Sequence, residues 1–323
     1  MTDTAPQPAV LYVGGVPPHA LDALHQHFRV HTLADIVDRD AFVAEHGATV
    51  FGAVTNGHDG FSTDWMDALP ALKVISCCGV GYDAIDANAA ADRGIMVTHT
   101  PNVLNADVAN TAIMLMLATS RQLLRDDAWA RSGAWAAKGA APLTRSIEGA
   151  TVGILGLGRI GESLASKLQA FNCQVHYHTR TRRDHVDYTH HTSAASLAEA
   201  SDYLVVITPG GASTQHLVNR EVLDALGPDG TLINVSRGSV VDEAALVDAI
   251  TEGRLHMAGL DVFEHEPTIP EALTRSDRVV LLPHVGSATV ETRRAMGDLT
   301  VDNLLSWRRD GAVLTPVPEC AAH

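Results

Sequence analysis

The chain has 323 residues, of which 46% are hydrophobic, and a formal net charge of -15. This length is sufficient for two domains of ordinary size, each with its own core. The acidic surplus argues against a nucleic-acid partner and against an anionic membrane surface, because both would need a basic footprint. The longest apolar stretch, Ala112 to Ala118, is far too short to cross a bilayer.

The four cysteines, Cys77, Cys78, Cys173 and Cys320, form no CxxC pair. Their spacing suggests neither a zinc site nor a disulfide framework, so we expect no bound metal. Cysteines in apolar runs, as most of these are, are typical of buried thiols in a reducing compartment. The segment Met1 to Pro8 lacks the basic and apolar regions of a secretory signal, and we therefore expect a cytoplasmic protein.

Strand-like and helix-like runs alternate along the first part of the chain. We expect strands over Val10–Val13, Thr49–Val54, Leu72–Cys77 and Ile95–Thr98, and helices from Pro18, near Asp64–Leu69 and over Ala84–Arg93. A long helix is predicted next, from about Asn105 to Arg131, and its apolar turns indicate burial on most sides. Gly133–Leu143 has no clear period and is interpreted as a linker.

The second part of the chain has the same alternation. The expected strands are Thr151–Leu155, Gln174–Thr179, Tyr203–Thr208, Thr231–Ser236, Met257–Val262 and Val279–Pro283. Helical segments such as Glu162–Ala170 and Glu243–Glu252 separate most of them, and a last helix covers about Thr289–Arg309. Near-continuous apolar strands between helices predict a doubly wound parallel sheet covered on both faces.

A glycine-rich turn follows the strand Thr151–Leu155. Its residues are Gly156, Leu157, Gly158, Arg159, Ile160 and Gly161, which match G-x-G-x-x-G between a strand and a helix. In such a turn the first glycine permits the sharp bend, the second lets the backbone approach a pyrophosphate, and the third allows close helix–strand packing. The helix N-terminus then favours the diphosphate anion, so this turn predicts a dinucleotide site.

The cofactor preference is indicated by the end of the next strand. NAD sites place an acidic residue there to bind the ribose hydroxyls. This chain instead has Thr179, Arg180 and Thr181, followed by two more arginines. Because a guanidinium pairs with a 2′-phosphate that a carboxylate would repel, we predict NADPH over NADH.

Three titratable residues follow strands at the edge where such sheets bind ligands. Arg237 comes directly after Thr231–Ser236, Glu266 closes a later loop, and His284 follows the last strand. An arginine can hold the carboxylate of a 2-oxo acid and polarise its ketone, while a histidine protonates the oxygen as hydride arrives. A carboxylate beside the histidine keeps the acid form available. A second anion-binding site is expected at Gly79-Val80-Gly81, whose backbone N–H groups can form a concave anion-binding nest.

With these motifs in place, the sequence resembles the D-isomer-specific 2-hydroxyacid dehydrogenases. The resemblance covers nearly the whole chain and is nearest to the NADP-linked glyoxylate/hydroxypyruvate and hydroxyphenylpyruvate reductase group. The segments that carry it are Gly79–Asp86, Thr151–Gly161, Asn234–Gly238, Gly259–Pro267 and Leu282–Ser287.

The resemblance implies two doubly wound domains, flavodoxin-like and Rossmann-like, with a cleft between them. Residues 1–99 and 287–323 would form the substrate-binding domain, and residues 100–286 the dinucleotide-binding domain. It implies that Arg237 orients the substrate, His284 is the acid/base, Glu266 tunes it, and the amides of Val80 and Gly81 bind the substrate carboxylate. Cofactor contacts are expected from Thr208, Pro209, Val235, Ser236, Asp261, His284 and Gly286 as well as from the turn. The helix after Thr100 would serve the contact of a homodimer.

The expected function is therefore NADPH-dependent reduction of a small 2-oxo acid, such as glyoxylate or hydroxypyruvate, to the D-2-hydroxy acid. Two alternatives remain: an NAD-dependent dehydrogenase of another 2-hydroxy acid, and a non-catalytic dinucleotide-sensing protein. One departure from the family concerns Pro209–Ser213, where glycines stand at positions that carry bulkier residues in many relatives. A methylene in a substrate pocket changes selectivity by only ~1–3 kcal/mol, so the sequence does not rank the acids.

Overall fold

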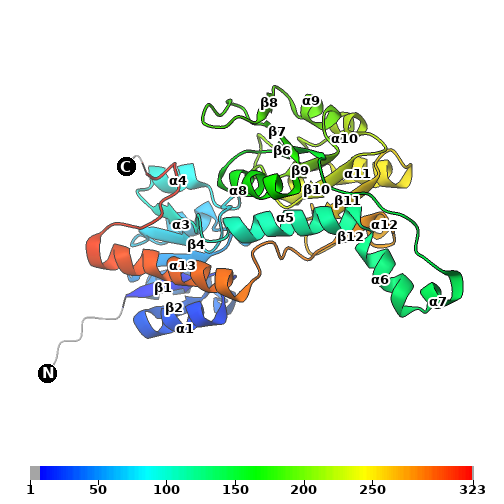
Figure 1. Ribbon diagram of the computed structural model, residues 1–323. Coiled ribbons are helices and arrows are strands. Elements are labelled where there is room, and N and C mark those ends of the chain that lie inside the picture. The colour runs from blue at the N-terminus through cyan, green and yellow to red at the C-terminus, as the bar shows by residue number, and fades with distance from the viewer. Residues whose placement is uncertain (1–7, 322–323) are drawn as a thin grey trace. The chain divides into compact units, whose positions relative to one another are not determined.

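The computed structural model describes residues 8–321. The chain forms two compact units: unit 1 contains residues 8–104 and 288–321, and unit 2 contains Asn105–Ser287 (Figure 1). Each unit has a wholly parallel β-sheet flanked by helices. The predicted fold class, two α/β domains built on parallel sheets, is confirmed.

Unit 1 is built on a five-stranded sheet with strand order β2-β1-β3-β4-β5. Its strands are β1 (Ala9–Tyr12), β2 (Arg29–Thr32), β3 (Val50–Thr55), β4 (Val74–Cys77) and β5 (Met96–Thr98). Its helices are α1 (Pro18–His27), α2 (Arg39–His46), α3 (Thr63–Ala68), α4 (Ala87–Asp92) and α13 (Val290–Asp310), with a 3₁₀ turn at Leu33–Asp35.

Two cores lie on opposite faces of this sheet. Val10 packs with Leu24 of α1 and Leu304 of α13 on one face. Leu11, the next residue of the same strand, packs in the other core, to which Met66 of α3 also belongs. Because successive strand residues point to opposite faces, a continuous apolar strand supplies both cores, as the sequence predicts for a parallel sheet.

Unit 2 is built on a seven-stranded sheet with strand order β12-β11-β10-β9-β6-β7-β8. Its strands are β6 (Thr151–Leu155), β7 (Gln174–His178), β8 (Thr189–His191), β9 (Tyr203–Val206), β10 (Thr231–Asn234), β11 (Met257–Leu260) and β12 (Val279–Leu281). Its helices are α5 (Asn105–Ser120), α6 (Leu123–Arg131), α7 (Ala134–Lys138), α8 (Arg159–Leu168), α9 (Ala194–Glu199), α10 (Arg220–Leu226), α11 (Glu243–Thr251) and α12 (Glu271–Thr274), with 3₁₀ turns at Gln169–Phe171 and Gly238–Val240.

Helices α5 and α8 pack against each other, and α5 lies on β10, β11 and β12 (Figure 1). Helices α9, α10 and α11 pack in a second layer, and their buried residues share one core with strands β9, β10 and β11. The strand order reverses beside β6, because the chain continues to β7 and β8 on one side and to β9 on the other. Such a reversal opens a crevice at the carboxyl ends of the strands, where open α/β sheets bind ligands.

The prediction of one helix from Asn105 to Arg131 is wrong, because the chain turns between α5 and α6. Gln122 has a left-handed backbone, with φ of 51°. At the end of α5, Thr119 Oγ1 donates to the carbonyl of Leu115 at 2.7 Å and Ser120 Oγ to that of Leu117 at 3.2 Å. Hydroxyl groups that compete for helix carbonyls favour helix ends and bends. The expected linker also contains the short helix α7.

Candidate active site

Three adjacent strands bring the predicted catalytic residues to one edge of the unit 2 sheet. Arg237 follows β10, Glu266 lies in the loop after β11, and His284 follows β12. The strands are paired in parallel, so their carboxyl ends lie at the same edge. This edge is where the architecture places ligands.

Glu266 and His284 form a hydrogen-bonded pair. Glu266 Oε2 lies 2.8 Å from His284 Nδ1, and Oε1 accepts a hydrogen bond from the Phe263 amide at 3.0 Å. The imidazole side chain is 45% exposed, whereas the carboxylate is only 21% exposed. Because the carboxylate occupies Nδ1, the imidazole is held in one orientation and Nε2 is left for a substrate.

The backbone around His284 is fixed by Asp261. The Asp261 carboxylate accepts hydrogen bonds from the amides of Val285 at 2.7 Å and Gly286 at 2.8 Å, and the Asp261 carbonyl accepts from the His284 amide at 2.8 Å. Burial raises the pKa of Asp261, although the two amides and His284 act in the opposite direction. His284 has φ of 52°, a conformation that non-glycine residues adopt mainly where the surroundings enforce it.

Arg237 is positioned by its own turn. The side chain of Asn234, which is 1% exposed, donates to the Arg237 carbonyl at 3.0 Å. The same Asn234 side chain accepts from the Ser236 amide at 3.1 Å. Arg237 Nη1 donates to the Ser236 carbonyl at 2.8 Å, and the Arg237 side chain is half-buried.

Gly238 brings the Arg237 loop directly against the Glu266 loop. A Cβ atom at this position would lie 1.9 Å from the Phe263 carbonyl carbon and 2.2 Å from the Glu264 amide nitrogen. These distances leave no room for any side chain. The two loops that carry Arg237 and Glu266 therefore contact each other through their backbones.

The phosphate-binding turn has the geometry that a dinucleotide requires. Gly156 has φ of 104°, and a Cβ there would lie 2.8 Å from the Thr208 amide nitrogen. A Cβ on Gly161 would lie 2.4 Å from the Gly156 carbonyl oxygen, so this glycine permits close approach of α8 to the turn. Gly158 faces open space, and no side chain caps the N-terminus of α8. The residues present fit a pyrophosphate at this helix end.

The predicted 2′-phosphate loop follows β7. Thr179 Oγ1 donates to the Thr181 carbonyl at 2.7 Å, and the hydroxyl of Tyr177 accepts from the Arg183 amide at 2.9 Å. The side chain of Arg180 is exposed, and within residues 8–321 no carboxylate forms an ion pair with it. A fixed backbone with an exposed guanidinium group fits a phosphate ligand.

The remaining cofactor-site predictions lie at the same edge of the sheet. Thr208 and Pro209 follow β9 next to Gly156, and the Pro209 carbonyl accepts from Thr214 Oγ1 at 2.7 Å. Val235 and Ser236 are buried in the turn after β10.

The predicted substrate loop lies in unit 1, after β4. The carbonyls of Gly79, Val80 and Gly81 all accept hydrogen bonds, from the Thr100 amide at 2.8 Å, His99 Nδ1 at 3.0 Å and Cys77 Sγ at 3.6 Å. Within the described part of the chain, no protein hydrogen bond is recorded for the amides of Val80 and Gly81. Those amides are the groups that the sequence predicts to bind an anion.

The sequence did not reveal which residues hold the loops of the site in place, although it predicted a cofactor contact for Asp261. Asn234 and Asp261 hold the backbones beside Arg237 and His284, and His216 pairs with Glu264 at 2.7 Å in the neighbouring loop. In unit 1 the hydroxyl of Tyr82 donates to Glu319 Oε2 at 3.0 Å, and this contact together with burial raises the Tyr82 pKa.

Comparison with known proteins identifies the family. Residues 113–286 match the NAD-binding domain of D-isomer specific 2-hydroxyacid dehydrogenases. A hydroxyphenylpyruvate reductase of Plectranthus scutellarioides is 47% identical over 85% of this chain and 88% of its own. A glyoxylate/hydroxypyruvate reductase of Arabidopsis thaliana is 45% identical over 87% of this chain and 89% of its own.

A solved structure has the same fold over nearly the whole length. The NADPH-dependent glyoxylate/hydroxypyruvate reductase of Sinorhizobium meliloti, crystallised with NADP and malonate, superposes with a TM-score of 0.91 at 48% identity. The superposition covers 97% of this chain and 98% of that chain. The chain belongs to the D-isomer specific 2-hydroxyacid dehydrogenase family, which confirms the resemblance noted in the sequence. Across residues 8–321, no helix has the length and apolar character that crossing a bilayer requires.

Proposed function

We propose that this protein is an NADPH-dependent reductase that converts a small 2-oxo acid to the D-2-hydroxy acid. The observation that carries the proposal is the 2.8 Å pair of Glu266 and His284, which follow β11 and β12, at the sheet edge where Arg237 follows β10 and which also bears the phosphate-binding turn. The relatives named above act as reductases of this kind, which supports the same reaction class here.

In the proposed mechanism, the guanidinium of Arg237 binds the substrate carboxylate and polarises the ketone oxygen. We further propose that the amides of Val80 and Gly81 bind a substrate carboxylate, as the sequence predicts for unit 1. Bound NADPH supplies the hydride. The His284 imidazolium donates its Nε2 proton to the ketone oxygen, and Glu266 stabilises the positive charge until that transfer. One proton and one hydride convert the carbonyl group to a hydroxyl group, so a 2-keto acid gives a secondary alcohol and glyoxylate, an aldehyde, gives a primary one.

The proposed cofactor site combines the turn after β6 with the loop after β7. The amides at the start of α8 would bind the pyrophosphate, and Arg180, with Thr179 and Thr181, would bind the 2′-phosphate. Thr208, Pro209, Val235, Ser236, Asp261 and Gly286 complete the set of proposed contacts.

The test is the initial rate of NADPH and NADH oxidation by the purified protein with glyoxylate, hydroxypyruvate and hydroxyphenylpyruvate. Fast oxidation of NADPH and much slower oxidation of NADH would support the proposal. Fast turnover with NADH would favour the alternative NAD-dependent dehydrogenase. Dinucleotide binding without turnover on any 2-oxo acid would favour the sensing role. In an active protein, His284→Ala should lower kcat by ~10²–10⁴-fold while NADPH still binds.

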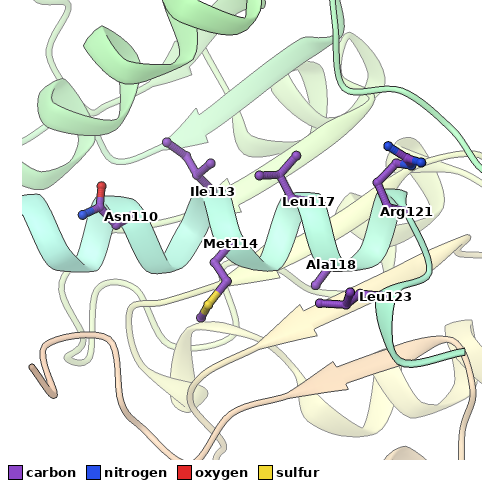
Figure 2. A pocket seen from close by; sticks show the side chains of 7 residues that line it. All are labelled: Asn110, Ile113, Met114, Leu117, Ala118, Arg121 and Leu123. Atoms are coloured by element: carbon purple, nitrogen blue, oxygen red, sulfur yellow. The ribbon is translucent and has the colours of Figure 1, made fainter. Parts of the chain in front are cut away.

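We also propose that the protein is a homodimer that uses the outer surface of α5 and the α6–α7 segment. A hollow of about 470 Å³ is lined by Ile113, Met114, Leu117 and Leu123 together with Asn110, Ala118 and Arg121 (Figure 2). Met114 is 46% exposed, Leu124 58% and Trp135 69%. Apolar side chains grouped in this way favour burial against a second copy.

Light scattering after size exclusion tests the dimer. Leu117→Glu should shift the protein toward the monomer, because a carboxylate would enter the apolar surface. The matched control is Val37→Glu, at a fully exposed apolar residue in unit 1. A dimer that persists in Leu117→Glu would place the interface elsewhere.

A further inference from the structure

His216 lies where three loops of the unit 2 sheet meet. It belongs to the loop after β9, and its amide donates to the carbonyl of Ser239 at 2.8 Å, in the loop that begins with Arg237. Its ring nitrogen Nε2 lies 2.7 Å from Oε1 of Glu264, in the loop that carries Glu266. A single residue therefore connects the loop of Thr208 and Pro209 to the loops of Arg237 and Glu266.

The backbone of His216 is in an unfavourable conformation. Its φ is 50°, in the left-handed region that glycine and asparagine occupy most readily. Residues other than glycine are uncommon in this conformation, which persists where the surroundings enforce it. The short contact with Glu264 supplies a reason for a ring at this position.

Glu264 is the link from His216 to the catalytic pair. Its amide donates to Glu243 Oε1 at 3.1 Å, and the preceding amide, that of Phe263, donates to Oε1 of Glu266 at 3.0 Å. Gly238 packs against the same two residues, 263 and 264, without room for a Cβ. The Glu264 side chain thus anchors the short segment whose backbone orients the Glu266 carboxylate.

The charges near His216 favour this contact. The hydrogen bond that His216 donates to Glu264 raises the pKa of His216, and the charges of Glu264 and Asp242 act in the same direction. The imidazole is 39% exposed and the Glu264 carboxylate 22% exposed, so the pair is only partly screened by water.

We propose that His216 is a positioning residue for the reduction: through Glu264 it holds residues 263–266 so that Glu266 remains hydrogen-bonded to His284. The inference rests on the proposed function. His216 touches neither the substrate nor the transferred proton in this proposal, and its effect passes through the Glu266 loop.

Two substitutions separate the side-chain contact from the backbone conformation. The amide nitrogen of glutamine lies about as far from the backbone as Nε2 of histidine, so His216→Gln keeps the contact with Glu264. His216→Asn is too short to reach Glu264, but asparagine is the better residue for a left-handed backbone. The positioning role predicts that Gln retains more activity than Asn, whereas a purely conformational role predicts the reverse order.

The measurements are kcat and KM with NADPH and glyoxylate or hydroxypyruvate, using the full chain. His216→Asn should lower kcat by about 10-fold to 100-fold, the usual effect of losing a supporting partner, with KM for NADPH changed less than about twofold. His216→Gln should retain most of kcat. Equal kcat in the wild type and Asn variants, or an equal loss in the Asn and Gln variants, would overturn the proposal.

Glu264 provides a second test if His216→Asn does not fold. Glu264→Gln keeps an oxygen that accepts from the imidazole, and Glu264→Ala removes it, so the Ala variant should lose more turnover. Hydrogen–deuterium exchange of residues 263–266 gives a readout without substrate: exchange should be faster in Glu264→Ala than in Glu264→Gln. Inactive wild-type protein would refute the proposed function, whereas equal exchange in the two variants would refute the positioning role.

Discussion

Replacing Glu266 with glutamine removes one of the two hydrogen bonds that its carboxylate accepts. The two carboxylate oxygens accept from different donors, the Phe263 amide at 3.0 Å and His284 Nδ1 at 2.8 Å. A glutamine has one oxygen, so its NH₂ group must face one of these donors. If the oxygen stays on Phe263, the NH₂ group faces Nδ1 and opposes the protonated imidazole.

The magnitude follows from the type of bond that is lost. A hydrogen bond between charged groups contributes about 1.5–3 kcal/mol. Because the imidazole is 45% exposed, we take the lower end, about 1.5 kcal/mol, to allow for screening by water. If this free energy is lost from the transition state, it corresponds to about a 10-fold lower kcat/KM.

The assay is kcat/KM for 2-oxo acid reduction at a fixed pH. Glu266→Gln should lower kcat/KM by about 10-fold, because the glutamine does not stabilise the positive charge on the imidazole that donates the proton. The NADPH dissociation constant should stay near that of the wild type. Glu271→Gln, at a 72% exposed carboxylate in α12, is the matched control and should leave kcat/KM unchanged. An unchanged kcat/KM in Glu266→Gln would refute the reasoning.

Three other predictions address the cofactor, the loop contact and the histidines. Arg180→Glu should weaken NADPH binding by about 10-fold to 100-fold with little change for NADH, measured by titration of both; equal weakening would show that Arg180 does not bind the 2′-phosphate. Gly238→Ala should lower the free energy of unfolding by about 1–3 kcal/mol in denaturant titrations, because the new Cβ overlaps Phe263; full stability would mean that the loop moves at no cost. Burial, and then the neighbouring histidines, lower the pKa values of His176 and His191. The stability that these groups contribute is therefore present above about pH 6.5 and is lost as the pH falls below it. His191→Gln should make the melting temperature depend less on acid pH, and an unaltered dependence would contradict this prediction.

The sequence predicted the sheets well because buried parallel strands are continuous apolar runs. Strand β6 has the predicted bounds, Thr151–Leu155, since the glycine-rich turn marks its end. The edge strands β2 and β8 were not predicted, because Arg29–Thr32 and Thr189–His191 are short and largely polar. Their pairing depends on a neighbouring strand that no local pattern records.

The site was predictable only where residue type and position after a strand were informative. The positions of Arg237 and His284 directly after buried strands pointed to the sheet edge. The supporting roles of Asn234 and Asp261 were not predicted, because each acts on backbone groups that only the folded turns bring near. The pairing of His216 with Glu264 joins residues 48 apart in two loops, and spacing alone could not reveal it.

The loop at Thr179–Arg183 and the catalytic trio lie on different halves of the unit 2 sheet, with β6 and β9 between β7 and β10. The loop is held by Tyr177 and His190, whereas the trio is held by other residues, and within residues 8–321 the two sets share none of these hydrogen bonds. We therefore expect substitutions in this loop to leave the geometry of the Glu266–His284 pair intact. On the proposal that this loop binds the 2′-phosphate, cofactor choice would be a separable trait, which evolution or design could exchange without rebuilding the chemistry.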